Sequence, residues 1–350
     1  MIRQAILLGD TSGVGHHGSQ TAIENLYCGL KRNDIIVQYA HNGKNWERNL
    51  RLRRQVKDCD LLIVNGEGTL HHDRPIARQL VAAAEFASDH GVPSVLVNTL
   101  WHFNSRKLAK STARFNLRFV RDRQSEVELR SYGVSSILTG DLTLLSGRVP
   151  APCERSGQIT VTDSADRQVS QLLWKLSSAP TLSRLPIVNR SSRKNKTTTI
   201  VRCRRLLQGL LAKIRAPEFH RRVREQWLPF GVSSSNAFME RLSRSRLIIS
   251  GRYHAVCFCL LTKTPFIAVP SNGQKIEALL AEAGCNPGRC IPRDQLPTDL
   301  GRFPTSCELS TIESYCIDRY LQSVRSRNED MFTQISELCR TNDRHHVRVP

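Results

Sequence analysis

The sequence predicts an α/β fold in which parallel, doubly wound sheets are arranged in two domains. Short apolar runs, each long enough for a strand, alternate with amphipathic helical stretches along most of the chain. Several of these runs end in glycine-rich polar turns, and open parallel sheets bind ligands at this end of their strands. The length of 350 residues exceeds what one hydrophobic core usually supports, so we expect two domains.

The first half of the chain contains six apolar runs with the length and composition of buried strands. They lie at residues 4–8, 35–40, 61–64, 94–101, 118–122 and 136–139. Helices are predicted between them at residues 19–30, 75–90 and 125–133, with Ser19 and Ser125 as the caps of the first and the last. This alternation is typical of a parallel sheet.

A proline-rich stretch at residues 149–157 is the predicted linker, and it divides the chain into domains 1–150 and 151–350. Strands of the second domain are expected at residues 158–162, 185–189, 247–249 and 264–269, and a helix at residues 276–283. Residues 310–339 are mostly helical in pattern. We expect this last helix to cross back onto the first domain.

The net charge of +20 indicates an anionic partner. The candidates are nucleic acid, a phosphorylated small substrate and an anionic membrane surface. Much of the excess lies in a basic segment at residues 190–224, which reads either as a solvated face or mobile loop or as a specific binding patch. Aromatic residues are sparse there, which disfavours base stacking. No recognised nucleic-acid motif is present, so we expect no nucleic-acid partner.

The lack of targeting signals in the sequence and the spacing of its cysteines predict a cytoplasmic protein. No apolar run approaches the roughly 18 residues of a membrane span, and the N-terminus lacks the length and cleavage site of a signal peptide. The eleven cysteines lack the paired spacing of zinc sites. Cys257 and Cys259 lie within an apolar segment, and Cys285 and Cys290 have no matching second pair. We therefore expect buried or idle reduced thiols and no metal.

Two polar turns in the first domain carry candidate site residues. The run at residues 61–64 enters a turn containing Glu67 between two glycines, and His71, His72 and Asp73 follow before a helix begins. The first strand enters a similar turn at residues 9–19, which holds Asp10 and His16. The alternative is a tight strand-to-helix turn whose histidines cap the helix or face solvent.

Two successive strand ends in the second domain each place a cation beside a helix N-terminus. Arg252 and His254 follow the strand at 247–249, and Lys275 opens the helix after the strand at 264–269. Free backbone N–H groups together with a basic side chain form a site for phosphate or carboxylate. The alternative is that Arg252 pairs with a structural carboxylate and His254 is a hydrogen-bonded core histidine.

Four segments together resemble the polysaccharide pyruvyltransferase family, in the order and with separations comparable to those of the family. They are Gly9-Asp-Thr-Ser with His16-His-Gly-Ser19, Asn65-Gly-Glu-Gly-Thr-Leu-His-His-Asp73, Gly251-Arg-Tyr-His254, and Pro265-Phe with Ser271-Asn-x-x-Lys275. The resemblance implies a GT-B-like fold, with two Rossmann-like domains facing a cleft. It also implies transfer of pyruvyl from phosphoenolpyruvate to two hydroxyls of one sugar, giving a ketal on a surface polysaccharide or its lipid-linked precursor.

The resemblance assigns roles to particular residues and implies no metal or dissociable cofactor. Arg252 and His254 match an Arg-x-His motif that serves the donor, and we expect His254 to act as general acid because its charge changes near neutral pH. The remaining predicted residues are Ser271, Asn272 and Lys275 on the donor side, and Asp10, His16, Glu67, His71, His72 and Asp73 on the acceptor side. A second donor arginine is also implied, and the sequence does not place it among Arg190, Arg193, Arg202 and Arg204.

Two other functions compete with this interpretation. A glycosyltransferase of the same two-domain shape would use a nucleotide-sugar donor and would ignore phosphoenolpyruvate. A basic polyanion-binding protein, from a different class, would bind many polyanions with steep salt dependence. Under the first interpretation, the excess charge attracts the protein to the anionic inner membrane face, where lipid-linked acceptors reside.

Overall fold

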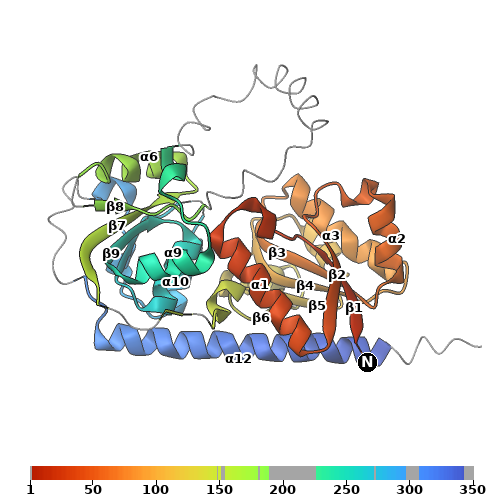
Figure 1. Cartoon of the computed structure of the whole chain (residues 1–350). Helices are drawn as coiled ribbons and strands as arrows, with labels where there is room; N and C mark the ends of the chain where they lie inside the picture. The colour runs from red at the N-terminus through yellow and green to blue at the C-terminus, as the bar shows by residue number, and fades with distance from the viewer. Residues whose placement is uncertain are drawn as a thin grey trace, which may run out of the picture. The chain divides into compact units, whose positions relative to one another are not determined.

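The computed structural model describes residues 2–147, 149–150, 154–179, 182–188, 226–271, 273–296 and 307–342, which form two compact units (Figure 1). Unit 1 comprises Met1–Ser12, Thr21–Ser146 and Arg319–Pro350, and unit 2 comprises Gly13–Gln20 and Gly147–Asp318. The chain therefore enters unit 2 once before its main crossing near residue 147. The basic segment 190–224, its four candidate arginines, and Asn272 lie outside the described residues.

Unit 1 is built on a six-stranded sheet whose paired strands are all parallel, as the sequence predicts. In spatial order its strands are β2 (Ile35–His41), β1 (Arg3–Leu8), β3 (Leu61–His71), β4 (Ser94–His102), β5 (Leu117–Val120) and β6 (Ile137–Leu138). Parallel pairing requires crossover connections, and helices between successive strands provide most of them.

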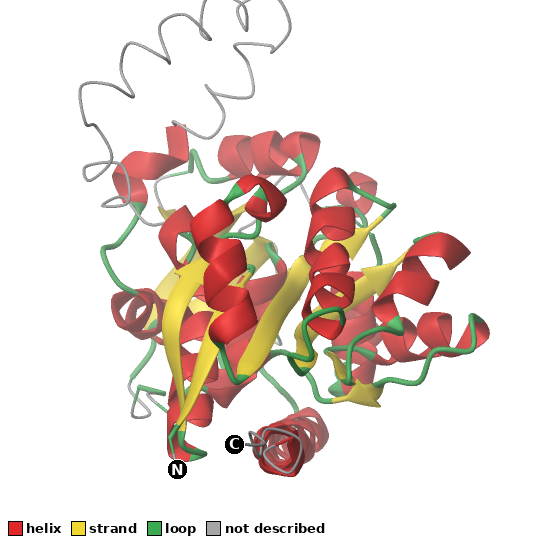
Figure 2. Cartoon of the chain, turned by 90° about the vertical axis from the view of Figure 1, so that its right-hand side faces the viewer, coloured by secondary structure: helices red, strands yellow, loops and turns green. Residues whose placement is uncertain are grey.

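Helices cover both faces of this sheet, and each face has its own apolar core (Figure 2). Successive residues of β1 and β3 point alternately into the two cores, because side chains alternate along a strand. One core receives α2 (Leu50–Asp58), α3 (Pro75–Ser88), α4 (Arg106–Thr112) and α5 (Arg123–Ser131). The other receives α1 (His17–Arg32) and α12 (Thr311–Asn342), whose Phe332 packs against Gly29.

Unit 2 contains a smaller parallel sheet in the order β10 (Phe266–Ala268), β9 (Ser245–Gly251), β7 (Ser156–Ser164) and β8 (Leu182–Arg184). Its helices are α6 (Arg167–Leu176), α9 (Ser235–Ser243), α10 (Tyr253–Thr262) and α11 (Lys275–Glu282). Ile159, Val161, Leu247 and Ile249 from the central strands form its core together with Trp227. Both central strands end beside polar loops, which position the residues described below.

Several predicted elements differ from the observed ones for identifiable reasons. The strand expected at 185–189 lies earlier, at Leu182–Arg184, since Pro186 has no N–H to continue the ladder. The strand expected to stop at residue 64 runs on to His71, because β4 continues to pair with it through an irregularity between Glu67 and Leu70. Helices α2, α4, α6 and α9 were not predicted.

Two predicted helix caps are wrong. Helix α1 begins at His17, and the N–H of Ser19 donates to Nδ1 of His16, so the preceding histidine provides the cap. Helix α5 is capped by Asp122, whose carboxylate accepts from the N–H of Ser125. In both cases the cap lies three residues before the predicted serine, as the N-cap to N3 hydrogen bond requires.

Helix α12 runs through residues of both units, with its first residues in unit 2 and the remainder from Arg319 in unit 1. Within the part of the chain that the structure describes, no helix combines the length and the apolar composition needed to cross a bilayer. The 32 residues of α12 are amphipathic, with Val324, Met331 and Ile335 buried and charged residues between them.

Candidate functional site

The carboxyl edge of the unit 1 sheet carries most of the residues predicted for the acceptor. Asp10 follows β1, and Glu67 and His71 lie in the last part of β3, with His72 and Asp73 directly after it. Because parallel strands end at one edge of a sheet, these groups gather on one side of unit 1. His16 belongs instead to unit 2.

Glu67 is a carboxylate with little exposure in an unusual backbone conformation. Its φ of 40° lies in the left-handed region, its side chain accepts from the hydroxyl of Thr11 at 2.5 Å, and 8% of its surface is exposed. The neighbouring Gly66 has no room for a side chain, since a Cβ there would lie 2.3 Å from Oγ1 of Thr99. Asp10 holds its own turn by accepting from the N–H of Ser12 at 2.9 Å.

The loop after β3 holds His72 and Asp73 in left-handed conformations, with φ of 54° and 46°. Nδ1 of His71 lies 2.9 Å from Nδ1 of His72. Asp73 accepts from the N–H of Ser105 at 3.0 Å. Although burial acts to raise the pKa of Asp73, the Ser105 hydrogen bonds and the charge of Arg78 lower it below its ordinary value. Strained non-glycine backbone of this kind persists where the surrounding contacts over-determine it, and such sites cluster at functional positions.

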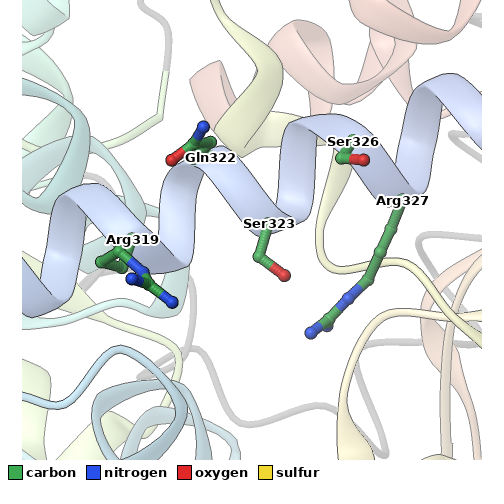
Figure 3. Close-up of a pocket in the computed structure, with 5 residues that line it drawn as sticks. All are labelled: Arg319, Gln322, Ser323, Ser326 and Arg327. Carbon is green, nitrogen blue, oxygen red and sulfur yellow. The ribbon is translucent and has the colours of Figure 1, made fainter.

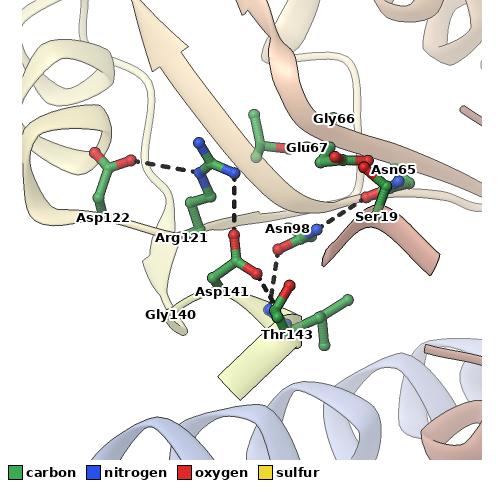
Figure 4. A network of polar contacts seen from close by, with 12 residues as sticks. Ser19, Asn65, Gly66, Glu67, Asn98, Arg121, Asp122, Gly140, Asp141 and Thr143 are labelled. Atoms are coloured by element: carbon green, nitrogen blue, oxygen red, sulfur yellow. Dashed lines mark hydrogen bonds and ion pairs between the residues drawn. The ribbon is translucent and has the colours of Figure 1, made fainter. Parts of the chain in front are cut away.

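Behind this edge lies a buried polar network that joins β3 and β4 to the ends of β5 and β6 (Figure 4). Asn98 donates to Oδ1 of Asn65 at 3.3 Å and accepts from the N–H of Leu142 at 3.1 Å. Nη1 of Arg121 lies 3.0 Å from Oδ2 of Asp141, and both side chains are almost completely buried. A buried charge is tolerated only when it is paired and hydrogen-bonded, so this pair fixes the ends of β5 and β6 relative to each other.

A second buried carboxylate adjoins the network. Asp122 accepts from the N–H and the hydroxyl of Ser125, both at 2.8 Å, and its Oδ1 lies 3.2 Å from Nε2 of His102. Burial acts to raise the pKa of Asp122, but His102, then Arg121 and the Ser125 N–H favour the charged form and lower it below its ordinary value. The edge of unit 1 is therefore rich in ionised carboxylates.

In unit 2, Arg252 occupies the N-cap position of α10, as predicted, and pairs with a carboxylate at the end of β7. Its Nε donates to Oδ2 of Asp163 at 3.0 Å, and its Nη2 contacts the same oxygen. The other oxygen of Asp163 accepts from the N–H of Ile187. The structural pairing left open as the alternative for Arg252 is thus present, and it orients the guanidinium.

His254 lies in the first turn of α10 with 8% of its surface exposed, and it faces His16 of the same unit. The two ring centroids are 5.2 Å apart in an edge-to-face arrangement. Gly18 makes this approach possible, because a Cβ at that position would lie 2.2 Å from Cβ of His254. Lys275 is the first residue of α11, and Ser271 lies four residues before it in a short bridge with Gly273.

The electrostatic surroundings of His16 show which groups of unit 2 act together. Burial lowers the pKa of His16 well below 6.5, and the positive charges of His254, Arg252, His17 and Lys275 lower it further. Since Nδ1 of His16 accepts from the N–H of Ser19, the neutral ring carries its proton on Nε2. His16 is therefore a neutral donor, and Arg252 and Lys275 are the permanently charged groups that act on it.

His17 is completely buried, and burial lowers its pKa to about 4, although the carbonyl of Val232 acts in the opposite direction. That carbonyl makes no hydrogen bond of ordinary geometry with the ring, and within the described residues neither ring nitrogen has another partner. The ring packs on Phe238 with centroids 5.1 Å apart. His17 is thus a neutral core histidine at physiological pH.

The structure brings together some predicted residues and separates others. Arg252, His254 and Lys275 share unit 2 with His16, whereas the other acceptor-side candidates share unit 1. The sequence interpretation did not single out Asp163, Arg121 or Asp141 as site residues. All three follow or end a strand of a parallel sheet, so the rule that selected Arg252 could have found them.

Two hollows occur among the described residues near these elements. One, of about 390 Å³, lies between α3 and α4 beside Asp73. The other, of about 490 Å³, lies on α12 and is lined there by Arg319, Gln322, Ser323, Ser326 and Arg327 (Figure 3). Neither contains His254 or Arg252 in its lining. Within the described part of the chain, no group of three or more histidine, cysteine, aspartate or glutamate side chains is arranged to hold a metal ion.

A family model described as polysaccharide pyruvyl transferase matches residues 23–273 of the chain. This range includes Glu67, the loop at residues 71–73, Arg252 and His254, whereas His16 lies before it. No curated protein matches the chain.

Solved structures support the fold. The chain is similar to a UDP-N-acetylglucosamine 2-epimerase, with a TM-score of 0.52, 9% sequence identity and 96% of each chain covered. It is also similar to S. aureus MnaA, solved with UDP, with a TM-score of 0.50, 11% identity, and 93% of this chain and 91% of that chain covered. At these identities the likeness shows the fold alone, and it confirms the predicted GT-B-like α/β class.

Proposed function

The chain belongs to the polysaccharide pyruvyl transferase family, and from this premise we propose that it transfers the pyruvyl group of phosphoenolpyruvate to two hydroxyls of one sugar, forming a cyclic ketal. The family implies a saccharide acceptor. We assign this acceptor to a surface polysaccharide or its lipid-linked precursor. The net charge of +20 suits a protein that works at an anionic membrane face, where such precursors are anchored.

The observation that carries this proposal is the group of cations and histidines in unit 2. Phosphoenolpyruvate has a phosphate and a carboxylate, so its site needs at least two cations or helix N-termini. Arg252 and Lys275 stand at the starts of α10 and α11, and both their charges act on His16. Ser271 precedes the second of these helices and adds a hydroxyl to the donor side, and Asn272, predicted for the same side, lies outside the described residues.

His254 is the proposed general acid of this site. Its proton goes to the methylene carbon of phosphoenolpyruvate, which becomes the methyl group and leaves a cationic centre at C2. One sugar hydroxyl attacks C2 and loses its proton to a base. The second hydroxyl then displaces phosphate, which takes up the second hydroxyl proton. The sum is one diol and one phosphoenolpyruvate giving one ketal and one phosphate.

The acceptor side of the proposal rests on the carboxyl edge of unit 1. Asp73 and Glu67 are carboxylates that accept hydrogen bonds, and His71 and His72 are paired imidazoles beside them. Sugar hydroxyls need acceptors of this kind, and one of these groups or Asp10 is the base for the attacking hydroxyl. His16 has a different role from the one predicted, because it faces His254 in unit 2. We assign it a place on the donor side.

Calorimetric titration of phosphoenolpyruvate into the full chain tests this function. We expect saturable binding that Arg252→Ala removes and that Arg244→Ala, an exposed arginine of the same unit paired with Glu240, leaves unchanged. UDP-N-acetylglucosamine is titrated in parallel, because both solved relatives take their names or ligands from UDP compounds. Binding of the nucleotide sugar without binding of phosphoenolpyruvate would reject pyruvyl transfer and favour a glycosyltransferase.

A further inference from the structure

The hollow between α3 and α4 in unit 1 shares Asp73 with the proposed acceptor loop, and the proposed reaction uses none of its other lining residues. Its volume of about 390 Å³ falls within the range of small-ligand sites. Ala82 and Leu108 form an apolar floor. Around this floor stand charged and hydroxyl side chains from the two helices and from the loops that precede them.

The lining combines both signs of charge. Asp73 and Glu85 supply carboxylates, and Arg78 and Lys107 supply cations. Within the described residues, neither the Glu85 carboxylate nor the Lys107 ammonium has a hydrogen bond or an ion pair. Asp73 is held in place by the N–H of Ser105, and its remaining lone pairs can still accept. The hollow therefore offers fixed acceptors opposite available donors.

This lining disfavours ligands with a net charge and apolar ligands, and it suits a neutral saccharide. An anion would meet Asp73 and Glu85, and a cation would meet Arg78 and Lys107, so either charge is opposed by two of its own kind. An apolar ligand would desolvate four charges without replacing their hydrogen bonds. A neutral saccharide avoids both costs, because each hydroxyl donates and accepts while the C–H face of the ring lies on the apolar floor.

An exposed aromatic ring adjoins the same loops. Phe103 is 57% exposed and has a φ of 55°, a conformation that a phenylalanine rarely adopts. Its ring contacts His72, with centroids 5.0 Å apart, one residue before Asp73. Phe103 also stands two residues before Ser105 of the hollow. A large apolar ring held out toward solvent at such a place is suited to lie under the face of a sugar.

We propose that the hollow between α3 and α4, together with Phe103, binds a neutral sugar unit of the acceptor chain that adjoins the unit receiving pyruvyl. The identification of this sugar as part of the acceptor rests on the proposed function, because Asp73 belongs both to this hollow and to the proposed acceptor loop. Saccharide binding itself does not depend on that function. The hollow on α12 differs, since its described lining has two arginines and no carboxylate (Figure 3).

Saturation-transfer NMR on the full chain tests the proposal with neutral probes, namely cellotriose, maltotriose and N-acetyllactosamine, and with glucuronate as a charged probe. We expect at least one neutral probe to bind. Lys107→Met and Glu85→Gln should each weaken that binding by about fivefold to tenfold, the effect of losing or weakening one ordinary hydrogen bond. Phe103→Ala should weaken it comparably.

Matched controls separate this site from general effects. Lys110→Met changes an exposed lysine on the same helix outside the hollow, and Gln322→Ala changes the lining of the hollow on α12. Both should leave binding unchanged. The proposal is overturned if no neutral probe binds, if glucuronate binds in preference, or if the variants in the hollow bind like the controls. Titration of phosphoenolpyruvate into the same samples reports separately on the proposed function, so that its failure is not confused with failure of the saccharide site.

Discussion

The two units present the same kind of edge, the carboxyl ends of a parallel sheet, with opposite electrostatic character. At the edge of unit 1 the charged groups are mostly carboxylates, and the deepest of them, Asp141 and Asp122, are held by Arg121, His102 and backbone N–H groups. At the edge of unit 2 the groups are Arg252, His254, His16 and Lys275, with Asp163 as their carboxylate.

Under the proposed function, this difference lets one fold class serve two substrates of different charge. A phosphorylated carboxylic acid needs cations and helix N-termini, which unit 2 supplies. A saccharide needs many hydrogen-bond acceptors, which the carboxylates and histidines of unit 1 supply. The sheet provides position in both units, and the residues after each strand provide the chemistry.

The largest expected effect is on the free energy of unfolding, and it comes from breaking the buried ion pair between Arg121 and Asp141 in unit 1. Arg121→Met leaves Asp141 buried without its partner, which should lower the free energy of unfolding by about 3–5 kcal/mol. Arg123→Met, which removes an exposed arginine paired with Glu126, should cost less than about 1 kcal/mol. Chemical denaturation of both variants measures the difference. Equal costs would mean that the buried pair does not support the edge of unit 1.

The next largest effect is the loss of stability in acid that arises from the buried histidines of unit 2. His17 has a pKa of about 4 when folded and about 6.5 when unfolded, so below pH 6.5 the unfolded chain binds more protons. Stability from this group is therefore complete above pH 6.5 and is lost as the pH falls toward 4, by about 3 kcal/mol in all. The lowered pKa of His16 acts in the same direction.

His17→Gln should flatten the dependence of unfolding free energy on pH between about 6.5 and 4, because glutamine does not titrate. The unaltered chain, measured alongside, gives the reference dependence. The carboxylates with lowered pKa, such as Asp122, begin to lose their contribution as the pH approaches the ordinary value of 3.8, so they overlap only the acid end of this window. An unaltered slope in His17→Gln would place the acid sensitivity elsewhere.

A smaller effect on stability comes from Gly18, where the helix and the site make opposite demands. Alanine is favoured over glycine inside a helix by about 1 kcal/mol. At this position its Cβ would lie 2.2 Å from Cβ of His254, and relieving that clash should cost about 1–3 kcal/mol and displace the imidazole. Gly13→Ala meets no atom within 4 Å and serves as the control. Thermal melting and pyruvyl transfer are measured for both, and full activity in Gly18→Ala would show that His254 tolerates displacement.

The sequence was sufficient to predict the parallel α/β class and most strands of unit 1, because apolar runs and glycine-rich turns are local signals. Helices α2 and α4 escaped prediction since α2 is dominated by arginines and α4 has only seven residues. The strand β8 was misplaced by a few residues because only its pairing with β7 distinguishes it from the apolar residues that follow.

For the site, the sequence could select residue types but not their partners. Arg252, His254 and Lys275 follow strands directly, and that placement is visible in sequence. That His16 faces His254 could not be predicted, because about 240 residues separate them and the contact depends on the grouping of residues 13–20 with unit 2. The same holds for Asp163 and Arg252, which pair only through the register of β7 and β9.

The smallest expected effect comes from a change to Asp163, the carboxylate that pairs with Arg252 among the described residues of unit 2. Asp163→Asn keeps an oxygen that can accept from the Arg252 guanidinium but removes the negative charge beside it. If charge distinguishes the two edges, phosphoenolpyruvate should then bind a few-fold more tightly at low salt, and the gain should shrink at high salt as the charges are screened. Calorimetry at two salt concentrations measures both. Weaker binding at either concentration would mean that Asp163 serves mainly to orient the guanidinium, and geometry would then matter more than charge at this edge.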